Sequence, residues 1–421
     1  MYALIDCNNF YVSCERAFQP ELQNRAGVVL SNNDGCAIAR SQEAKDKGIK
    51  MGEPYFQMKE THKDVWVRSS NYPLYHDIML RVTSIIRRYF PDQEIYSIDE
   101  CFCDLSGYEY MDPEELALQL RAELLQCTGI PVCIGVARTK TLSKIANRIA
   151  KKKYKERGVF FLSSLEDEHE ALKQTEIGDV WGIGRQHAAR LINIGVDNAY
   201  KFTQLTVGWV QLYMTIVGVR MWRELNGESC IPMEYIRAKK KGIGTSRSFG
   251  KAETDLSVML EALATYTSIA ALKLRNQNSV CAKINVFTHT SMFADPKNRY
   301  SVGLDLKLEV PTSSTSELIK AAKYLLRRIF KPGYRYQKVG IFLMDIRPDD
   351  QVQQSLFDTK VESRGKLITA LKAMDSINRK QGKDSVRMAA TGYERKWTMK
   401  QENLSRGYTT NIRDVLVVKA K

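Results

Sequence analysis

Residues 243–346 follow an order of strand-like and helix-like segments that few folds accept. The segments are a strand around TSRSF, a helix (LSVMLEALATYTSIAALKLRNQ), two strands (VCAKINVFTH and YSVGLDLKLEV), a helix (STSELIKAAKYLLRRIF) and a strand (QKVGIFLMDI). In the third of these strands Val302, Leu304, Leu306 and Leu308 share one face, which indicates that this face is covered. The order predicts a βαββαβ unit of the split-βαβ type that folds as a separate small domain.

The rest of the chain predicts further domains, because 421 residues are too many for one core. Residues 1–165 mix short apolar strands, among them 2–6 and 27–31, with amphipathic helices, among them 37–49. Short helices and glycines follow from about residue 166, and the chain from Asp349 onward is polar and only patchily helical. We therefore expect a multi-domain α+β protein.

Charge is unevenly distributed along the chain. Lys and Arg number 63 against 48 Asp and Glu, which gives a formal net charge of +15. The first 110 residues hold 12 basic and 16 acidic residues, so the other 311 hold 51 basic and 32 acidic ones. An acidic beginning and a long basic body predict a polyanionic partner such as nucleic acid, although ribosomal and membrane-surface proteins share this balance.

The N-terminal residues MYALIDCNNFYVSC have no basic residue ahead of their apolar ones and an early Asp6, which is unlike a signal peptide. No run of 18 apolar residues occurs, so we expect no membrane association. The nine cysteines form no C-x-x-C pair, which favours reduced thiols. We expect a cytoplasmic protein.

Two adjacent carboxylates, Asp99 and Glu100, stand in the otherwise strand-like stretch EIYSIDECF at residues 94–102. Carboxylates are rarely buried without a partner, so the pair is either a solvated hairpin tip or part of a cation site. Successive strand residues point to opposite faces, so the two can share a site only where the strand bends. With Asp6, at the end of the first predicted strand, they could converge on Mg²⁺ ions of the kind that clamp the oxygens of phosphoryl transfer.

Seven blocks stand in order along the chain: MYALIDCNNFYVSCE, LSNNDGCAIAR, KGIKMGEPYF, EIYSIDECFCDLSG, IGVARTKTLSKIANRIAKK, DVWGIGR and SRSFG. In this order they resemble a Y-family translesion DNA polymerase. The late block KWTMKQENLSRGYTT, which most of the wider family lacks, resembles the UmuC branch of that family. The resemblance covers essentially the whole chain.

The resemblance implies a right-hand polymerase with a ferredoxin-like palm, small fingers, a helical thumb with a helix-hairpin-helix, and the βαββαβ unit as little finger. The implied boundaries are palm 1–20 and 75–165, fingers 21–74, thumb 166–232, little finger 240–348, and a C-terminal tail, 349–421, with a clamp-binding motif and a candidate partner-binding segment.

The resemblance also implies a metal site. Asp6 and Asp99 would bind both metal ions, Glu100 would help to hold the catalytic ion, and the backbone carbonyl of Cys7 would be a further ligand. The implied cofactor is a pair of Mg²⁺ ions, for which Mn²⁺ can substitute. Asn8 stands where the wider family usually has a second acid, a departure that the UmuC branch shares.

Six residues match nucleotide-binding positions of the family. Tyr11, beside Phe10, stands at the place of the steric gate, the aromatic ring that collides with a ribose 2′-hydroxyl; without the resemblance both would read as core aromatics. Lys45 and Lys151 match cations on the triphosphate, where the alternative is a lysine on a solvated face. Asn33 and Arg40 are further nucleotide contacts by the same resemblance.

Other motifs match DNA and partner contacts. Gly182, Ile183 and Gly184 in WGIGR resemble a helix-hairpin-helix turn whose N–H groups approach a DNA phosphate, although a plain helix-helix turn explains a G-x-G equally well. Arg247 and Ser248 would touch template phosphate. The stretch QQSLF, with Gln353, Leu356 and Phe357, resembles the peptide that binds the bacterial sliding clamp.

The resemblance implies an error-prone, template-directed DNA polymerase that bypasses lesions in the bacterial SOS response by two-metal-ion nucleotidyl transfer. Its partners would be primer-template DNA, deoxynucleoside triphosphates, the sliding clamp, a processed UmuD-type dimer and a recombinase filament, with no membrane. The alternative is a non-catalytic DNA-binding accessory protein that retains the polymerase fold. Another palm-bearing nucleotidyl transferase, such as a cyclase, would share the acids but lack the G-x-G thumb and the βαββαβ unit.

Overall fold

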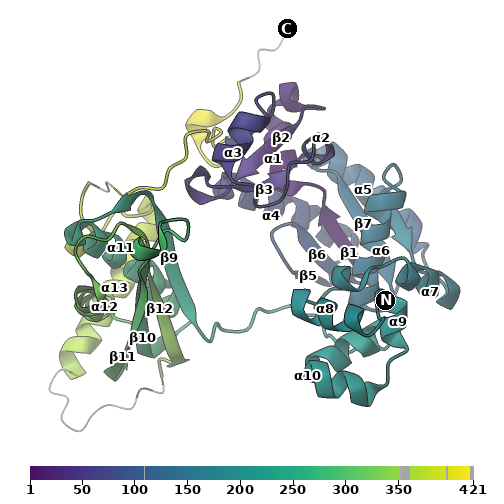
Figure 1. The fold of residues 1–421 in the computed structure, drawn as a ribbon. Helices are drawn as coiled ribbons and strands as arrows, with labels where there is room; N and C mark the ends of the chain where they lie inside the picture. Colours follow the sequence, from purple (N-terminus) through teal and green to yellow (C-terminus); the bar gives the residue numbers. More distant parts are fainter. Residues whose placement is uncertain (109, 351, 353–360, 395–396, 418–421) are drawn as a thin grey trace. The chain divides into compact units, whose positions relative to one another are not determined.

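The computed structural model describes residues 1–108, 110–350, 352, 361–394 and 397–417, and it divides into two compact units (Figure 1). Unit 1 comprises Met1–Arg237 and Glu402–Lys421, and unit 2 comprises Ala238–Gln401. The chain therefore leaves unit 1, builds unit 2, and returns. In the described part of the chain no helix combines the length and the apolar character needed to cross a membrane.

A five-stranded sheet forms the centre of unit 1, with the strand order β5-β6-β1-β7-β8. Its strands are β1 (Tyr2–Cys7), β5 (Gln93–Ile95), β6 (Glu100–Asp104), β7 (Val132–Ala137) and β8 (Val159–Phe161). The middle strand, β1, is antiparallel to both of its neighbours, and β7 is parallel to β8. The central strand of the sheet is thus the one that ends in Asp6 and Cys7.

Helices cover both faces of this sheet, as Figure 1 shows. Helices α1 (Phe10–Phe18), α4 (Tyr72–Tyr89) and α5 (Pro113–Thr128) share a core with Ala3, Ile5 and Cys7 of β1. Helix α6 (Lys140–Lys153) packs on β1 and β7 and shares a second core with the helices that follow it. Because strand side chains alternate between faces, Leu4 and Asp6 point to the side opposite Ile5, toward α6.

Local sequence signals explain where these helices begin. The Asp112 side chain accepts hydrogen bonds from the N–H groups of Glu114 and Glu115, and Pro113 occupies the first position of α5. The Thr139 hydroxyl accepts from the N–H of Leu142 at the start of α6. Side-chain caps of this kind satisfy N–H groups that the first turn of a helix leaves without partners.

A small three-stranded sheet, in the order β3-β2-β4, belongs to the same unit. Its elements are β2 (Gly27–Leu30), β3 (Ala37–Arg40), α2 (Gln42–Asp46), α3 (Tyr55–Thr61) and β4 (Trp66–Ser69). The prediction of one helix over 37–49 is wrong, because Ala37–Arg40 pairs with β2 as a strand. The Ser41 hydroxyl then accepts from the N–H of Ala44, so the helix begins only at Gln42.

Four helices follow the five-stranded sheet: α7 (Leu165–Lys173), α8 (Arg185–Asn193), α9 (Ala199–Thr203) and α10 (Val207–Leu225). Their buried side chains form one core with those of α6. Short 3₁₀ helices along the described chain span Pro20–Leu22, Asn32–Asp34, Ile177–Asp179, Pro296–Asn298, Ala389–Thr391 and Ile412–Asp414.

Unit 2 contains the predicted βαββαβ order. Its elements are β9 (Ile243–Glu253), α11 (Leu256–Asn276), β10 (Ser279–Thr290), β11 (Ser301–Thr312), α12 (Thr315–Ile329) and β12 (Tyr336–Pro348). The strand order is β11-β10-β12-β9 and every neighbouring pair is antiparallel. Consequently β9 and β10 run in the same direction with β12 between them, which confirms the split-βαβ arrangement, and α11 and α12 bury one face of the sheet.

The chain beyond β12 contributes more regular structure than the sequence indicated. Helix α13 (Val361–Gln381) has 21 residues and belongs to unit 2. Its Asp375 forms a two-pronged ion pair with Arg275 of α11, at 2.6 and 2.9 Å, and both side chains are buried. Arg275 also donates to the Ser313 carbonyl and the Thr315 hydroxyl, so this charged group makes four hydrogen bonds.

We expect the replacement Asp375→Asn to destabilise unit 2 by about 3 kcal/mol, because removing one member of a buried pair leaves an unbalanced charge. The matched control is Asp305→Asn, which breaks the exposed cross-strand pair with Lys283 and should cost less than about 1 kcal/mol. Denaturant unfolding of the full chain measures both. Equal effects of the two substitutions would show that the Arg275–Asp375 pair does not hold α13 in place.

Candidate active site

The register between β1 and β6 sets Asp6 directly opposite Glu100. Opposed residues of an antiparallel pair have their side chains on the same face of the sheet. Asp99 precedes β6 in the turn from β5, and its carbonyl accepts a hydrogen bond of 2.9 Å from the N–H of Cys7. The three acids therefore lie on adjacent strands of one sheet, at the end of β1.

The turn between β5 and β6 is built around one serine. The Ser97 hydroxyl accepts from the N–H groups of Asp99 and Glu100, at 3.2 and 3.0 Å, and donates to the Asp99 carboxylate at 2.5 Å. The N–H groups of Tyr96 and Ser97 both donate to the Glu100 carbonyl. The stretch EIYSIDECF is thus a bent hairpin, in which Asp99 occupies the turn and Glu100 the first position of β6.

The two arms of this hairpin differ in burial. The apolar residues of the stretch predict that Ile95 and Phe102 each anchor one arm in the core; this holds for Phe102, which is fully buried, and is wrong for Ile95, which is 36% exposed. The reason is the length of β5, which ends at Ile95, where the chain already turns outward.

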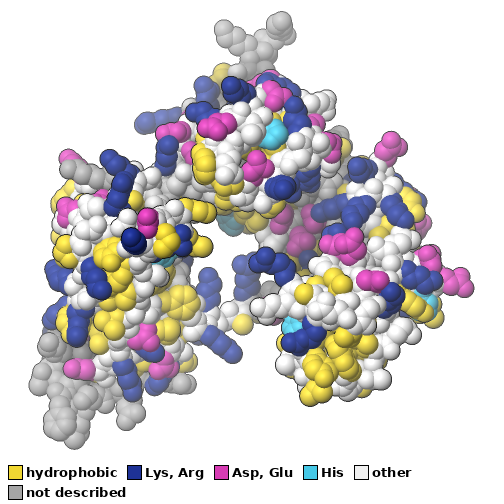
Figure 2. Space-filling model, viewed as in Figure 1, with side chains coloured by type: hydrophobic (Ala, Val, Ile, Leu, Met, Phe, Trp, Pro, Cys, Tyr) yellow, Lys and Arg dark blue, Asp and Glu magenta, His cyan; other side chains and the backbone are white. Residues whose placement is uncertain are grey.

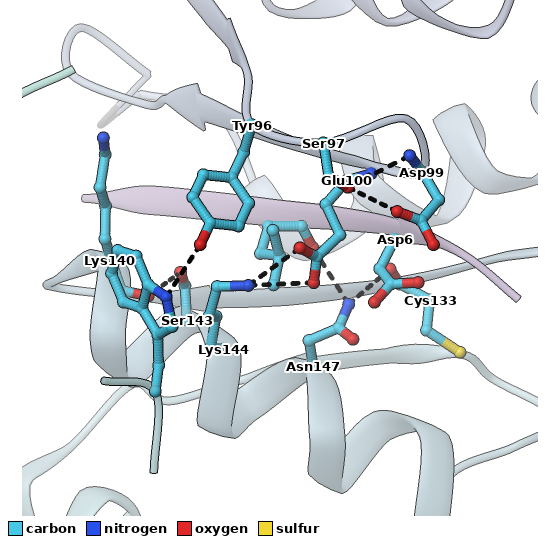
Figure 3. A network of polar contacts seen from close by, with 12 residues as sticks. Asp6, Tyr96, Ser97, Asp99, Glu100, Cys133, Lys140, Ser143, Lys144 and Asn147 are labelled. Carbon is cyan, nitrogen blue, oxygen red and sulfur yellow. Dashed lines mark hydrogen bonds and ion pairs between the residues drawn. The ribbon is translucent and has the colours of Figure 1, made fainter. Parts of the chain in front are cut away.

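Two lysines of α6 pair with two of the three acids. The Lys144 ammonium lies 3.0 Å from both oxygens of Glu100 (Figure 3). The Lys151 ammonium lies 2.5 Å from Asp6. The two lysines are seven residues apart, which is two helical turns, so they project from the same face of α6. Lys151 was a predicted site residue, whereas Lys144 was not.

The electrostatics show that the acids act on one another. Burial raises the pKa of Asp6 to about 6; Lys151 opposes this rise, and the charges of Glu100 and Asp99 add to it. Within the residues that the structure describes, no three Asp, Glu, His or Cys side chains stand close enough to form a ready-made metal centre. The arrangement is a set of oxygen ligands suited to a hard cation, with ammonium groups balancing the charge of Asp6 and Glu100.

Three aromatic rings surround the Lys144 ammonium. Its nitrogen lies 4.5 Å from the ring centre of Tyr96, 5.4 Å from Trp181 and 5.5 Å from Phe102. The Trp181 indole N–H donates to the Tyr96 hydroxyl at 3.0 Å. Trp181 therefore connects the helical part of unit 1 to the acidic hairpin, and the contact holds Lys144 beside Glu100.

Sequence reasoning missed Lys144 and two neighbours on the same helix. Lys140 forms a buried ion pair with Glu94. Asn147 donates to the carbonyls of Leu4 and Cys133 and so joins α6 to two strands. The sequence does indicate that these residues share a helix face with Lys151, because positions 140, 144, 147 and 151 follow one another at helical spacing in the same block. This spacing predicts which residues share a helix face, but it does not predict which part of the protein that face contacts.

The residues expected at the nucleotide come from several elements. Tyr11, near the start of α1, is half-buried and its ring stacks on Tyr75 of α4, with ring centres 4.5 Å apart and planes 16° apart, while Phe10 is buried in the core. Asn33 lies in the 3₁₀ helix that precedes β3 and has a left-handed backbone, with φ of 61°.

Three cations lie near one another beside Asp6. Burial lowers the pKa of Lys45, and the positive charges of Arg40 and Lys151 lower it further. The Lys45 ammonium donates to the Asn9 side chain at 2.7 Å, and Arg40 donates to the Ile49 carbonyl at 2.6 Å. The fingers-like small sheet and α6 thus direct basic groups to one space. Figure 2 shows how Lys and Arg side chains are spread over the visible face of each unit.

The residues expected at DNA lie in both units. In unit 1, Gly182 has φ of 88° and Gly184 immediately precedes α8, but the Ile183 side chain is buried, so only its backbone can face a phosphate. In unit 2, Arg247 and Ser248 lie on β9, an edge strand of the four-stranded sheet. The clamp-like residues Gln353, Leu356 and Phe357 fall outside the described residues.

Solved structures with the same fold are Y-family DNA polymerases. A Y-family DNA polymerase chimera, Dbh-Dpo4-Dbh, matches 82% of this chain and 99% of its own with a TM-score of 0.66 at 19% identity. The insertion ternary complex of Dbh DNA polymerase matches the same shares with a TM-score of 0.53. The likeness confirms the expected fold class, that of a right-hand polymerase. We use the names palm, fingers, thumb and little finger, which the resemblance implied, for the five-stranded sheet, the three-stranded sheet, helices α7–α10 and the βαββαβ unit, in that order.

Sequence comparison gives the family. The impB/mucB/samB family matches residues 5–148, the C-terminal domain of that family matches 240–356, and a domain of unknown function matches 370–418. Protein UmuC of Salmonella typhimurium is 40% identical over 100% of both chains, and protein ImpB of Salmonella typhimurium is 39% identical over 99% of both. The chain belongs to the impB/mucB/samB family, in the UmuC branch of the Y-family translesion DNA polymerases, which use divalent metal ions.

The two glycines of the thumb turn predict different responses to substitution. Gly182→Ala should destabilise the chain by about 1–2 kcal/mol, because alanine is strained at positive φ and the added carbon would lie 2.9 Å from the Met221 side chain. Gly184→Ala is the matched control, since no atom lies within 4 Å of the added carbon, and it should cost less than about 1 kcal/mol. Denaturant unfolding measures the difference, and equal costs would contradict the left-handed turn.

Proposed function

We propose that this chain extends a DNA primer opposite a damaged template: the primer 3′-hydroxyl attacks the α-phosphate of a deoxynucleoside triphosphate and pyrophosphate leaves. The observation that carries the proposal is the register that sets Asp6 opposite Glu100, with Asp99 in the adjoining turn and three cations beside them. Acids and cations at one place match a reaction that needs both metal ligands and partners for phosphate charge.

In this proposal Asp6, Asp99, Glu100 and the carbonyl of Cys7 hold two Mg²⁺ ions, for which Mn²⁺ can substitute. When bound, the ions would lower the cost of the charge that develops on the attacking and leaving oxygens. The carboxylates fit this role by their chemistry, because all the ligand atoms are oxygens. Burial and the neighbouring acids also raise the pKa of Asp6, so a bound cation would stabilise its ionised form. Lys144 and Lys151 hold Glu100 and Asp6 in position, and Lys151 would be able to turn toward the triphosphate once Asp6 served as a metal ligand.

The chain's own residues select and hold the nucleotide in this proposal. Lys45, Arg40 and Lys151 neutralise charge on the triphosphate, and Asn33 and Phe10 complete the contact. The ring of Tyr11, stacked on Tyr75, closes the space that a ribose 2′-hydroxyl would need. Tyr11 is therefore the proposed steric gate.

DNA is held by elements of both units in this proposal. The backbone of Gly182, Ile183 and Gly184 approaches one phosphate, and Arg247 and Ser248 meet template phosphates, contacts that position the duplex without reading its sequence. The residues Gln353, Leu356 and Phe357 are the proposed contact with a sliding clamp. A processed UmuD-type dimer and a recombinase filament are the further proposed partners, in keeping with error-prone synthesis in the SOS response.

Primer extension opposite an abasic template with Mg²⁺ tests the acids. Asp99→Asn and Glu100→Gln should each lower the rate by more than about 10²-fold, because each removes a charged ligand at the reacting oxygens. Asp104→Asn is the matched control, since Asp104 ends the same strand opposite Tyr2, away from the site. If the unsubstituted chain, supplied with its proposed partners, adds no nucleotide, the non-catalytic accessory protein becomes the better reading.

Steady-state kinetics test the triphosphate contact. Lys151→Ala should raise KM for the incoming nucleotide about tenfold, the effect expected for losing a hydrogen bond between charged groups. Lys152→Ala, on the exposed side of α6, should leave KM unchanged. An equal effect of both substitutions would mean that Lys151 acts only as part of a general positive surface.

A further inference from the structure

The chain's C-terminal segment Glu402–Tyr408 is part of unit 1, although it follows unit 2 in sequence. The N–H of Glu402 donates to the buried carboxylate of Asp34 at 2.8 Å. Asn403 accepts from the Ser69 N–H at 2.9 Å and donates to its hydroxyl at 3.0 Å, where the segment runs parallel to the end of β4. The return of the chain is therefore hydrogen-bonded to the fingers through its backbone. Figure 1 shows this segment in yellow.

Asn71 fixes the next residues of the segment. Its side-chain N–H group donates to the Ser405 hydroxyl at 3.1 Å and to the Arg406 carbonyl at 3.2 Å. Its side-chain oxygen accepts from the N–H of Leu74 and so caps α4. One buried amide thus ties Ser405 to the helix that carries Tyr75.

Glu15 of α1 is a fully buried carboxyl group that the proposed reaction does not use. One of its oxygens accepts from the Tyr75 hydroxyl at 2.7 Å and from the Ser405 hydroxyl at 2.9 Å. Its other oxygen accepts from Gln19 at 3.2 Å. A buried carboxyl group is costly unless it is hydrogen-bonded. Because both hydroxyls donate to the same oxygen of Glu15, the position of the Ser405 hydroxyl is linked to that of the Tyr75 hydroxyl.

These contacts end at Tyr11. The ring of Tyr75 is fully buried and stacks on Tyr11, while Tyr72 meets the Tyr11 ring edge-on at 5.9 Å. Tyr11 and Glu15 are four residues apart on α1, so they lie on the same side of that helix. At the other end of α1, Phe18 stacks on Tyr408 with ring centres 4.8 Å apart and planes 6° apart.

We propose that the C-terminal segment Glu402–Tyr408 is a structural part of the sugar-selecting site, in which the Ser405 hydroxyl, through Glu15 and Tyr75, holds the ring of Tyr11 in place. The inference rests on the proposed function, because it assigns positioning residues to the proposed steric gate. A gate that excludes one hydroxyl group depends on the exact place of a ring, so a looser support admits ribonucleotides more readily. The segment lies within residues 370–418, which match a domain of unknown function, so the proposal assigns a role to the C-terminal part of that domain.

The experiment compares kcat/KM for a deoxyribonucleotide with kcat/KM for the matching ribonucleotide, using the full chain. Ser405→Ala should lower this ratio about three- to tenfold, the range that the loss of one hydrogen bond allows. Ser405→Thr, which retains the hydroxyl, should restore the ratio. Thr409→Val, at the residue that follows the segment, is the matched control, because the Thr409 hydroxyl is buried without a hydrogen-bond partner.

Tyr75→Phe provides a second route to the same result, since it keeps the stacked ring and removes only the hydroxyl that meets Glu15. It should lower the ratio as Ser405→Ala does. In a chain that already carries Tyr11→Ala, Ser405→Ala should change the ratio no further, because residues that act through one group are not additive.

The outcomes separate this inference from the proposed function. A ratio that falls with Tyr11→Ala but not with Ser405→Ala or Tyr75→Phe overturns the role of the segment and leaves the polymerase and its gate standing. A full additional effect of Ser405→Ala in the Tyr11→Ala chain also overturns it. If Tyr11→Ala leaves the ratio unchanged, the gate itself is wrong and the inference falls with it.

Discussion

The pairing of β1 with β6 is the constraint on which the rest of the site depends. A shift of this register by one residue would send Asp6 and Glu100 to opposite faces of the sheet, because side chains alternate along a strand. The hydrogen bond from the Cys7 N–H to the Asp99 carbonyl continues the pairing into the turn. Hydrophobic neighbours on both faces of β1 make the register costly to change, so the core of the palm also fixes the spacing of its acids.

Acids gathered at one partly buried place need opposite charge, and α6 supplies it. Lys144 and Lys151 pair with Glu100 and Asp6, while Trp181 of the thumb and Tyr96 of the hairpin enclose Lys144. The thumb therefore contributes to the acidic site through an aromatic contact. Figure 3 shows the Lys144 ammonium against the Glu100 carboxylate.

The chain returns to unit 1 after building unit 2. The domain of unknown function matches residues 370–418. The structure divides this stretch, because most of it belongs to unit 2 and the part from Glu402 onward belongs to unit 1. The first part is fixed to α11 by the buried Arg275–Asp375 pair, and the last part by hydrogen bonds to Glu15, Ser69 and Asn71. One sequence domain thus serves two separate cores.

The sequence by itself determined the βαββαβ order of unit 2, the helix that begins after Asp112, and the bend at Asp99 and Glu100, because each depends on local signals: periodicity, a capping side chain, or two charges that a flat strand cannot place together. It could not show that residues 37–40 form a strand, since their partner, β2, decides this. Only the tertiary structure revealed the pairing of Lys144 with Glu100 and the contact of Ser405 with Glu15, residues 390 positions apart. Contacts of that separation leave no periodic trace in a single sequence, because they depend on which surfaces the folded cores bring together.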